Sequence, residues 1–335
     1  MGAAEGILGE RQAGGEGGGN AGASEIPGLP LGACGRWWRR RMDRARTEWW
    51  LWPGLLSLEA PLVAVSWLYM FAYAWQVNYL PWPAYAALGI SVWLVYVVDR
   101  LMESRVREPG DPSLGPRHGF HCRNRRFFLI VAAMAAVWLL VLQLWFLPME
   151  LLTSYSIPAV VFVVGFFFLA YLSARSREVP FMRNLVAGLA FGYGTAAMAH
   201  IFVWTEGVFS LLGSREMLGF AVLCAVNITA IHIWERERTA ASEEERASME
   251  MGLTLPLVIV AVSALAFAYM DNPHLFAEHE GDLPARPFFL AILISAGLIL
   301  LLHRNRQRFG MEALRSLADL AMIVPLPLFL VISKH

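Results

Sequence analysis

The sequence predicts an all-α protein that crosses a membrane nine times, with its N-terminus in the cytoplasm. Of the 335 residues, 57% are hydrophobic and only 16% are charged, which is typical of a polytopic membrane protein. Several segments reach about 20 mostly apolar residues, the length that a helix needs to span a bilayer. The arginines are concentrated in alternate connecting segments, as the positive-inside rule describes.

The chain divides into three parts by composition. Residues 1–35 are rich in Gly and Ala and poor in aromatic and β-branched residues, so we expect a disordered tail. Residues 36–53 carry a cluster of arginines and are expected to form a basic amphipathic juxtamembrane segment. Residues 54–332 are expected to form the nine-helix transmembrane domain. The tail lacks the short apolar region of a signal peptide, so the first helix is expected to act as the signal.

Nine apolar segments meet the spanning length. In chain order they are 54–77, 82–102, 127–147, 151–172, 183–204, 211–234, 252–270, 287–303 and 314–332. Tryptophans stand near several ends, as in the aromatic belts of membrane proteins (Trp82, Trp93, Trp145, Trp204, Trp234). Four prolines fall inside these segments, where membrane helices tolerate them as kinks (Pro158, Pro256, Pro325, Pro327). The glycines of the fifth segment, Gly188, Gly192 and Gly194, are expected to allow close helix packing.

The basic residues set the predicted orientation. Arginines gather before the first helix and in the loops after helices 2, 4, 6 and 8, whereas the alternate loops carry only Arg215 and Arg286. The sequence therefore places those arginine-rich loops in the cytoplasm and the C-terminus outside. We expect a multi-pass protein of the cell inner membrane.

Two acidic clusters stand at matching depth, at the cytoplasmic ends of the second and sixth helices. Asp99 and Glu103 are four residues apart, so a helix places both carboxylates on one face. Such a pair can share a divalent cation, and magnesium typically takes one or two carboxylates while substrate phosphates complete its shell. Tyr96 lies on the same face, within reach of a phosphate. The alternative is that the two acids form ordinary ion pairs with Arg100 and Arg105.

The second cluster, Glu235 and Glu237, is spaced differently. Because the two glutamates are two residues apart, they point to different sides of a continuous helix. Asn227 lies two turns before Glu235 on a similar face, and His232 lies one turn before it. This stripe is interpreted either as part of a site or as a structural stripe that joins helices. A transporter path through these residues is a third alternative, although the acids lie at the membrane surface and no inverted repeat is evident.

With these residues in view, the chain resembles the UbiA superfamily of intramembrane prenyltransferases. Residues 96–103 (YVVDRLME) stand where that family has an Asn-Asp-x-x-Asp-x-x-x-Asp motif, with Asp99 and Glu103 at the last two acids. Residues 227–235 (NITAIHIWE) match the second motif at Asn227 and Glu235. Residues 171–194 (YLSARSREVPFMRNLVAGLAFGYG) are similar to the junction of the fourth and fifth helices.

The resemblance implies a magnesium-dependent transferase that moves an isoprenyl group from a prenyl diphosphate to a membrane-soluble acceptor. Asp99, Glu103 and Glu235 would be the catalytic, metal-binding residues. The implied substrate-binding residues are Tyr96, Arg117, Arg123, Arg175, Arg183 and Asn227. Each motif has lost two of the family's acids, so one magnesium ion is as consistent with the chain as two. The alternative function is a non-catalytic lipid- or partner-binding membrane protein of the same fold. The bilayer is an expected partner and nucleic acid is not.

Overall fold

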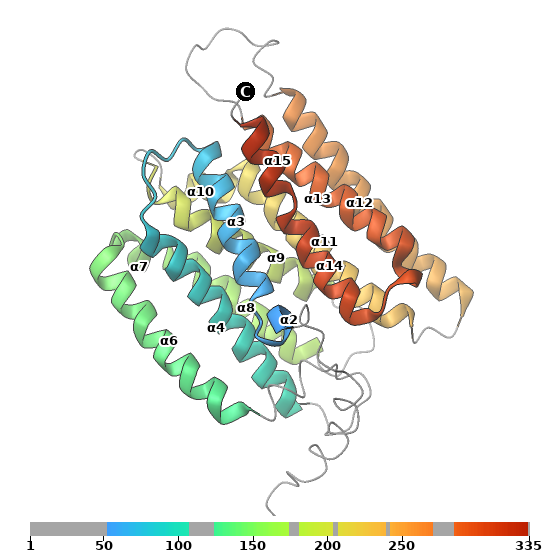
Figure 1. Cartoon of the computed structure of the whole chain (residues 1–335), viewed down its shortest axis with the longest axis horizontal. Helices are drawn as coiled ribbons and strands as arrows, with labels where there is room; N and C mark the ends of the chain where they lie inside the picture. The colour runs from blue at the N-terminus through green and yellow to red at the C-terminus, as the bar shows by residue number, and fades with distance from the viewer. Residues whose placement is uncertain are drawn as a thin grey trace, which may run out of the picture.

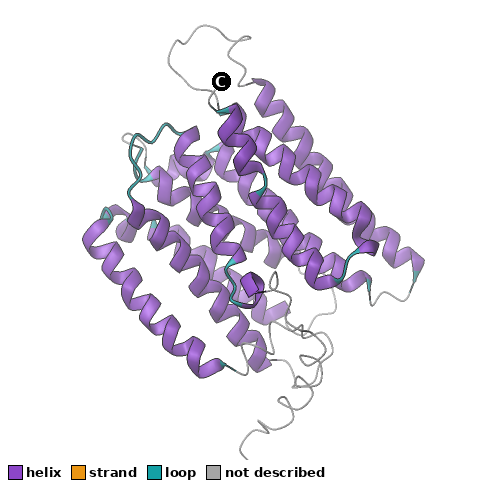
Figure 2. Cartoon of the chain, viewed as in Figure 1, coloured by secondary structure: helices purple, strands orange, loops and turns teal. Residues whose placement is uncertain are grey.

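A computed structural model describes residues 52–106, 124–173, 181–203, 207–238, 242–270 and 285–333. Over these ranges the regular secondary structure is entirely helical, with loops and turns between the helices and no strand (Figure 2). Of residues 55, 103–106 and 173 only the backbone is described. The expected tail 1–35 and nearly all of the juxtamembrane segment 36–53 lie outside the described residues.

The helices form one bundle, which Figure 1 shows with the N-terminal helices in blue and the C-terminal helices in red. The α-helices are α2 (Trp52–Leu55), α3 (Glu59–Ala74), α4 (Trp82–Val106), α6 (Arg125–Phe146), α7 (Glu150–Thr153), α8 (Ser156–Ser173), α9 (Phe181–His200), α10 (Val208–Gly213), α11 (Arg215–Glu237), α12 (Glu243–Met270), α13 (Arg286–Asn305), α14 (Met311–Ile323) and α15 (Pro325–Ile332). A short 3-10 helix, η2 (Arg306–Arg308), links α13 to α14.

Seven stretches of the described chain are long and apolar enough to cross a membrane. They are Trp82–Met102, Arg125–Phe146, Glu150–Leu172, Arg215–Glu237, Glu243–Met270, Arg286–Arg308 and Met311–Ile332. The two other expected spans are helical but do not reach this standard. Helix α3 has 16 residues, which at about 1.5 Å per residue is shorter than the hydrocarbon layer of about 30 Å. Helix α9 includes Arg183, Asn184 and several glycines, which lower its hydropathy.

The short length of α3 has a local cause at its C-terminus. Gln76 adopts a left-handed conformation, with φ of 51°. Its amide donates to the carbonyl of Tyr73, and the amide of Val77 donates to the carbonyl of Ala72. These two bonds make a Schellman motif, which satisfies the last carbonyls of the helix and ends it.

Prolines divide the expected spans at other places. The expected segment 151–172 is split into α7 and α8, so Pro158 lies in the first turn of α8, where its missing N–H leaves no bond unmade. The last expected span is two helices, because Pro325 begins α15 directly after α14 ends. Pro256 lies inside the uninterrupted α12, as membrane helices tolerate.

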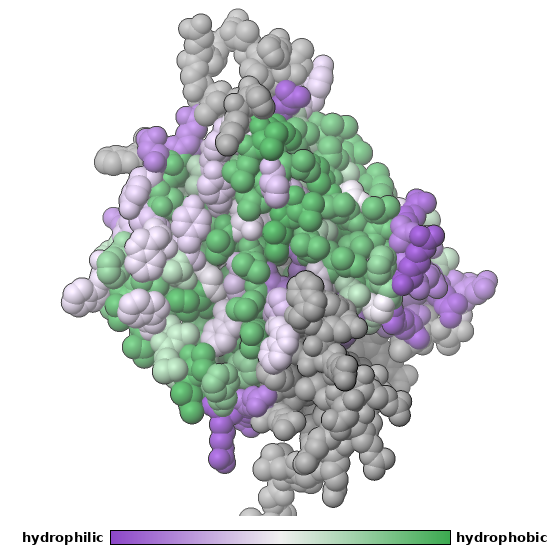
Figure 3. Space-filling model, in the orientation of Figure 1, coloured by the Kyte–Doolittle hydropathy of each residue, from purple (hydrophilic) through white to green (hydrophobic). Residues whose placement is uncertain are grey.

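The periphery and the centre of the bundle differ in burial. Only 11% of the span in α6 and 6% of the span in α7–α8 is buried, against 67% of the span in α11. The exposed side chains of α6 are large and apolar, among them Phe127, Ile130, Met134 and Trp138. Figure 3 shows such hydrophobic residues over much of the visible face. A surface of this kind suits lipid rather than water, so the chain is a membrane protein.

Aromatic rings hold α3 at the centre. Trp67 stacks on Phe220 of α11, with ring centroids 4.3 Å apart, and meets the edge of Phe288 of α13 at 5.4 Å. The indole N–H of Trp67 donates to the carbonyl of Met322 in α14 at 2.9 Å. One fully buried tryptophan therefore joins four helices, and its polar atom is satisfied.

Helices α9 and α11 pack closely through small residues. A Cβ atom on Gly188 would lie 2.5 Å from the carbonyl oxygen of Ala221 and 2.7 Å from the Cβ of Ala225. A Cβ on Gly192 would lie 2.6 Å from the Cβ of Ala221. Two glycines spaced by four thus face two alanines spaced by four, the small-residue packing that membrane helices use. The expectation is confirmed for these glycines but is wrong for Gly194, around which a Cβ meets nothing within 4 Å.

Candidate functional site

Polar side chains from four helices gather at the end of the bundle where α4 and α11 finish. We call them the polar cluster: Tyr96, Asp99 and Arg100 of α4, Arg183 of α9, Asn227, His232 and Glu235 of α11, and Arg315 and Asp319 of α14. Tyr96 is close enough to Asp319 of α14 and Cys224 of α11 to interact electrostatically. Arg100 lies in the same way within range of Glu235. The cluster therefore joins the two regions that the sequence singled out.

Glu235 is held by an arginine that the sequence did not associate with it. Arg315 of α14 donates from Nε at 3.0 Å and from Nη2 at 2.5 Å, both to Oε1 of Glu235. Nη1 of Arg315 donates to Glu312 at 2.8 Å. The Arg315 side chain is only 12% exposed, whereas the Glu235 side chain is 35% exposed. Oε2 of Glu235 accepts no hydrogen bond in the described part of the chain and remains available to a ligand.

Arg183 is in contact with the imidazole of His232. Nη2 of Arg183 lies 2.6 Å from Nε2 of His232. A guanidinium only donates hydrogen bonds, so Nε2 accepts, and the ring is neutral with its proton on Nδ1. The contact places a positive charge of α9 beside the stripe of α11 that carries Glu235. Arg183 is therefore located where an anionic group bound near Glu235 would meet it.

Asn227 is the buried member of the cluster. It is 7% exposed, and its Oδ1 atom has no hydrogen-bond partner among the described residues. Cys224 lies one turn earlier on the same face of α11, within electrostatic range of Tyr96 and Asp319. A buried amide oxygen without a partner costs about 1–3 kcal/mol. An unpartnered buried polar atom is one sign that a ligand or an ordered water belongs at that place.

The structure describes the other predicted site residues only in part. Asp99 is partly buried, and it follows Tyr96 by one turn on α4. Helix α4 is continuous through Glu103, which keeps Asp99 and Glu103 one turn apart, but the side chain of Glu103 is outside the described part. Arg117, Arg123 and Arg175 also lie outside the described residues.

Glu235 and Glu237 diverge, as their spacing predicts for a continuous helix. Glu237 accepts from Nε and Nη2 of Arg306, at 2.5 Å and 2.8 Å. Glu235 is bound instead to Arg315 of α14. The two carboxylates therefore belong to different surroundings, and only Glu235 is part of the polar cluster.

The described acids do not form a metal site by themselves. Among the residues that the structure describes, no group of three or more His, Cys, Asp or Glu side chains is placed to hold an ion. The free Oε2 of Glu235 and the carboxylate of Asp99 come from different helices. They fit magnesium only as the one or two protein carboxylates that complete a shell made mainly of phosphate oxygens and water.

Sequence reasoning missed the contribution of α14. Glu312, Arg315, Ser316 and Asp319 are polar residues at helical spacing in an otherwise apolar segment, which marks one polar face. Ser316 donates to Glu59 of α3 at 2.7 Å, so this face is directed into the bundle. The spacing could have identified the face, because an ionisable stripe on a membrane helix usually points to the interior.

Comparisons with known proteins add nothing to this geometry. No protein-family model, curated protein or solved structure was found to match the chain.

Proposed function

We propose that the chain is a membrane-embedded prenyltransferase, similar to the UbiA superfamily, whose site is the polar cluster. It moves an isoprenyl group from a prenyl diphosphate to a membrane-soluble acceptor. The observation that carries the proposal is the unpartnered, buried Oδ1 of Asn227 on the same stripe as Glu235. This stripe is faced by Tyr96 of α4 and bordered by arginines, a combination that suits a phosphate-bearing ligand with an apolar tail.

Each part of the cluster has a role in the proposal. Arg183 and Arg100 bind the diphosphate, because a guanidinium matches the geometry of phosphate oxygens. Tyr96 and Asn227 orient the substrate by hydrogen bonds. Arg117, Arg123 and Arg175 are further proposed phosphate ligands from connecting segments.

The reaction breaks the bond between the allylic carbon and the diphosphate oxygen. The electron pair stays on the diphosphate, and the acceptor then forms a new bond to the allylic carbon and loses a proton. Arginines near the leaving oxygens stabilise the charge that develops there. Asp99, Glu103 and Glu235 would hold magnesium together with substrate phosphates, and the ion would supply further neutralisation of that charge.

The polar cluster gives a first test of the proposal. Asp99→Asn and Glu235→Gln are each expected to lower transfer from a radiolabelled prenyl diphosphate by about 100-fold or more, because each removes charge from the site. Glu244→Gln, an exposed acid in the first turn of α12, serves as the matched control and is expected to keep full turnover. A chelator should abolish transfer and magnesium should restore it. Full turnover in both cluster variants would refute the assignment.

A second candidate is a non-catalytic protein that binds a lipid or a partner in the same cluster. The ion pair between Glu235 and Arg315 favours it, because an arginine already occupies one carboxylate oxygen. This candidate predicts no transfer under any metal condition. It also predicts that lipid co-purifies equally with and without chelator.

The proposal includes nine spans, in the cell inner membrane, with the site facing the cytoplasm. In this arrangement α3 and α9 also cross the bilayer inside a ring of more apolar helices. An enzyme reporter that works only outside the cytoplasm should be active when fused after residue 335 and silent when fused before residue 1. Activity at both ends or at neither would contradict an odd number of spans.

A further inference from the structure

A large pocket lies at the end of the bundle opposite the polar cluster. It has a volume of about 1020 Å³, just above the range of about 300–1,000 Å³ that is usual for small-ligand sites. Its lining comes from the loop after α3, from α7 and the residues that follow it, from the end of α9 and from the start of α10. Helix α9 carries Arg183 of the polar cluster near its beginning and ends at this pocket, so the two sites are nearly one helix length apart.

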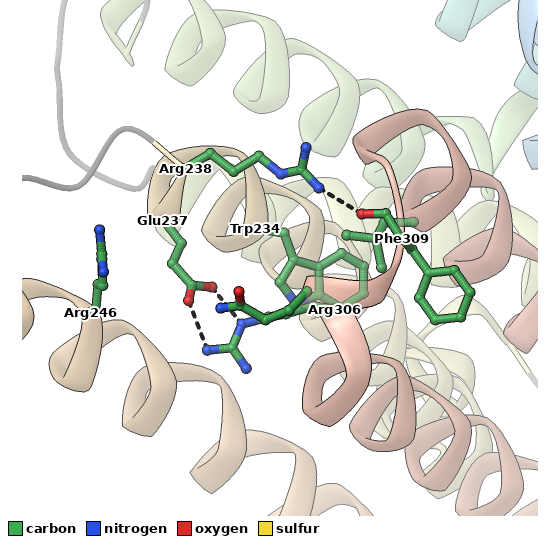
Figure 4. Close-up of a pocket in the computed structure, with 8 residues that line it drawn as sticks. Trp234, Glu237, Arg238, Arg246, Arg306 and Phe309 are labelled. Atoms are coloured by element: carbon green, nitrogen blue, oxygen red, sulfur yellow. Dashed lines mark hydrogen bonds and ion pairs between the residues drawn. The ribbon is translucent and has the colours of Figure 1, made fainter.

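The charged side chains of this pocket differ from those at the other end of the bundle. Among its described lining residues, Glu150 is the only charged one. A smaller pocket of about 430 Å³ beside the end of α11 contains several arginines, and Figure 4 shows Arg306 paired with Glu237 there. Glu150 is exposed and forms no ion pair with a described residue. The large pocket therefore offers a carboxylate to a cation and presents no described charge that would repel it.

Aromatic side chains make up much of the lining beside this carboxylate. They are Trp75, Tyr79, Tyr155, Phe202 and Phe209. The face of an aromatic ring carries negative charge density and attracts an organic cation that lies within about 6 Å of the ring centre. Tyr79 and Phe209 are 73% and 84% exposed, so their rings are accessible to a ligand. Several rings together with one carboxylate are the combination that recognises ammonium groups.

Two of these rings are held in place by a buried histidine. His200, at the end of α9, is 3% exposed, and its Nδ1 atom lies 2.7 Å from the hydroxyl of Tyr155. The His200 ring also meets the ring of Trp75 edge to face, with centroids 5.4 Å apart. The hydroxyl of Tyr193 donates to the backbone carbonyl of Tyr155 at 2.8 Å, and the Schellman motif at Gln76 fixes the backbone beside Trp75. Because these contacts form without a ligand, the two rings lose little conformational entropy on binding.

We propose that this pocket binds an organic ammonium group. The cation contacts the rings of Trp75 and Tyr155, and the carboxylate of Glu150 balances its charge. Tyr79 and Phe209 add ring contacts on the exposed side. Such a group is carried either by a lipid headgroup or by a small soluble amine. The site is independent of the proposed transfer reaction, since it lies at the other end of the bundle.

The test measures choline binding to the purified full-length protein in a maltoside detergent by isothermal titration calorimetry. Choline is compared with its uncharged isostere, in which a carbon atom replaces the nitrogen. The wild type is expected to bind choline about 10-fold or more tightly than the isostere, since only choline carries the charge. Glu150→Gln combined with Phe209→Leu should weaken choline binding by roughly 10-fold, because an exposed carboxylate and an exposed ring each account for about a threefold change.

A second measurement identifies the source of the ammonium group. Native mass spectrometry compares the retention of phosphatidylcholine with that of phosphatidylglycerol. Preferential retention of phosphatidylcholine that is lost in the double variant supports a lipid headgroup as the ligand. Choline binding without such retention supports a soluble amine. If neither choline nor phosphatidylcholine binds, the proposal is overturned.

The matched control combines Glu244→Gln and Phe127→Leu, an exposed acid and an exposed ring that do not line the pocket. This control makes the same chemical changes elsewhere and should keep the wild-type affinity for choline. Equal losses in the two double variants would contradict the site, since they would indicate an effect of overall charge and hydrophobicity. Equal binding of choline and its isostere would contradict recognition of the ammonium charge. Circular dichroism should show that both double variants keep the wild-type helix content.

Discussion

Gly188→Ala is expected to destabilise the folded bundle by about 1–3 kcal/mol, although alanine is a better helix former than glycine. The added Cβ would lie 2.5 Å from the carbonyl oxygen of Ala221 and 2.6 Å from the amide nitrogen of Ala225. Both are backbone atoms of α11, which move only if the two helices separate. Because α9 and α11 also position Arg183 and Glu235, the same change should disturb the polar cluster. The measurement is the unfolding midpoint of the purified protein in detergent.

Gly194→Ala is the matched control for this prediction. It lies in the same helix, and a Cβ there meets nothing within 4 Å. Here only the gain in helix propensity remains, so stability should rise by about 0.5–1 kcal/mol. If Gly188→Ala and Gly194→Ala shift the midpoint in the same direction by the same amount, the close packing of α9 on α11 is not a determinant of the fold.

Arg306→Gln is expected to destabilise the protein by about 3 kcal/mol, because it leaves the carboxylate of Glu237 without its partner in a poorly exposed position. The pair is joined by two hydrogen bonds, from Nε and Nη2. It links the end of α11 to the turn between α13 and α14, which are distant in sequence. The loss of stability should be measured as the shift in the unfolding midpoint of the purified protein in detergent, at low and at high salt.

Two further variants separate the pair from general charge effects. Arg308→Gln removes an exposed arginine two residues away and should change stability by no more than about 0.5 kcal/mol. Combining Arg306→Leu with Glu237→Leu removes both charges and is expected to restore most of the loss, since the cost comes from the unpaired ion. A double variant as unstable as Arg306→Gln would show that the loss has another origin.

Some features of the site follow directly from helical periodicity. The divergence of Glu235 and Glu237 and the shared face of Asp99 and Glu103 depend only on the rotation of about 100° per residue within a continuous helix. These properties belong to a single helix and need no knowledge of its neighbours.

Other features of the fold and the site depend on contacts between helices and could not be predicted from one segment alone. Hydropathy treated the segment around α3 as a span like the others, whereas the structure makes it a short helix that ends at the left-handed Gln76 and carries the central Trp67. The ion pair between Glu235 and Arg315 could not be predicted either. Arg315 is 80 residues away in the sequence, and whether its side chain contacts Glu235 depends on the rotation of α14. In the sequence, Arg315 is only one arginine at the start of the last predicted span, 314–332.

The sequence alone determined the class of the protein, because apolar composition and segment length decide whether a chain forms helices in lipid. It also determined which residues share a helix face, because that is a local matter of backbone geometry. Only the tertiary structure decided which faces meet, and so it paired Glu235 with Arg315, buried the amide of Asn227 without a partner and joined Glu237 to Arg306. The physical reason is that lipid-facing and core-facing helices are equally apolar, so hydropathy does not distinguish them, and side-chain packing and hydrogen bonds between distant segments set their arrangement.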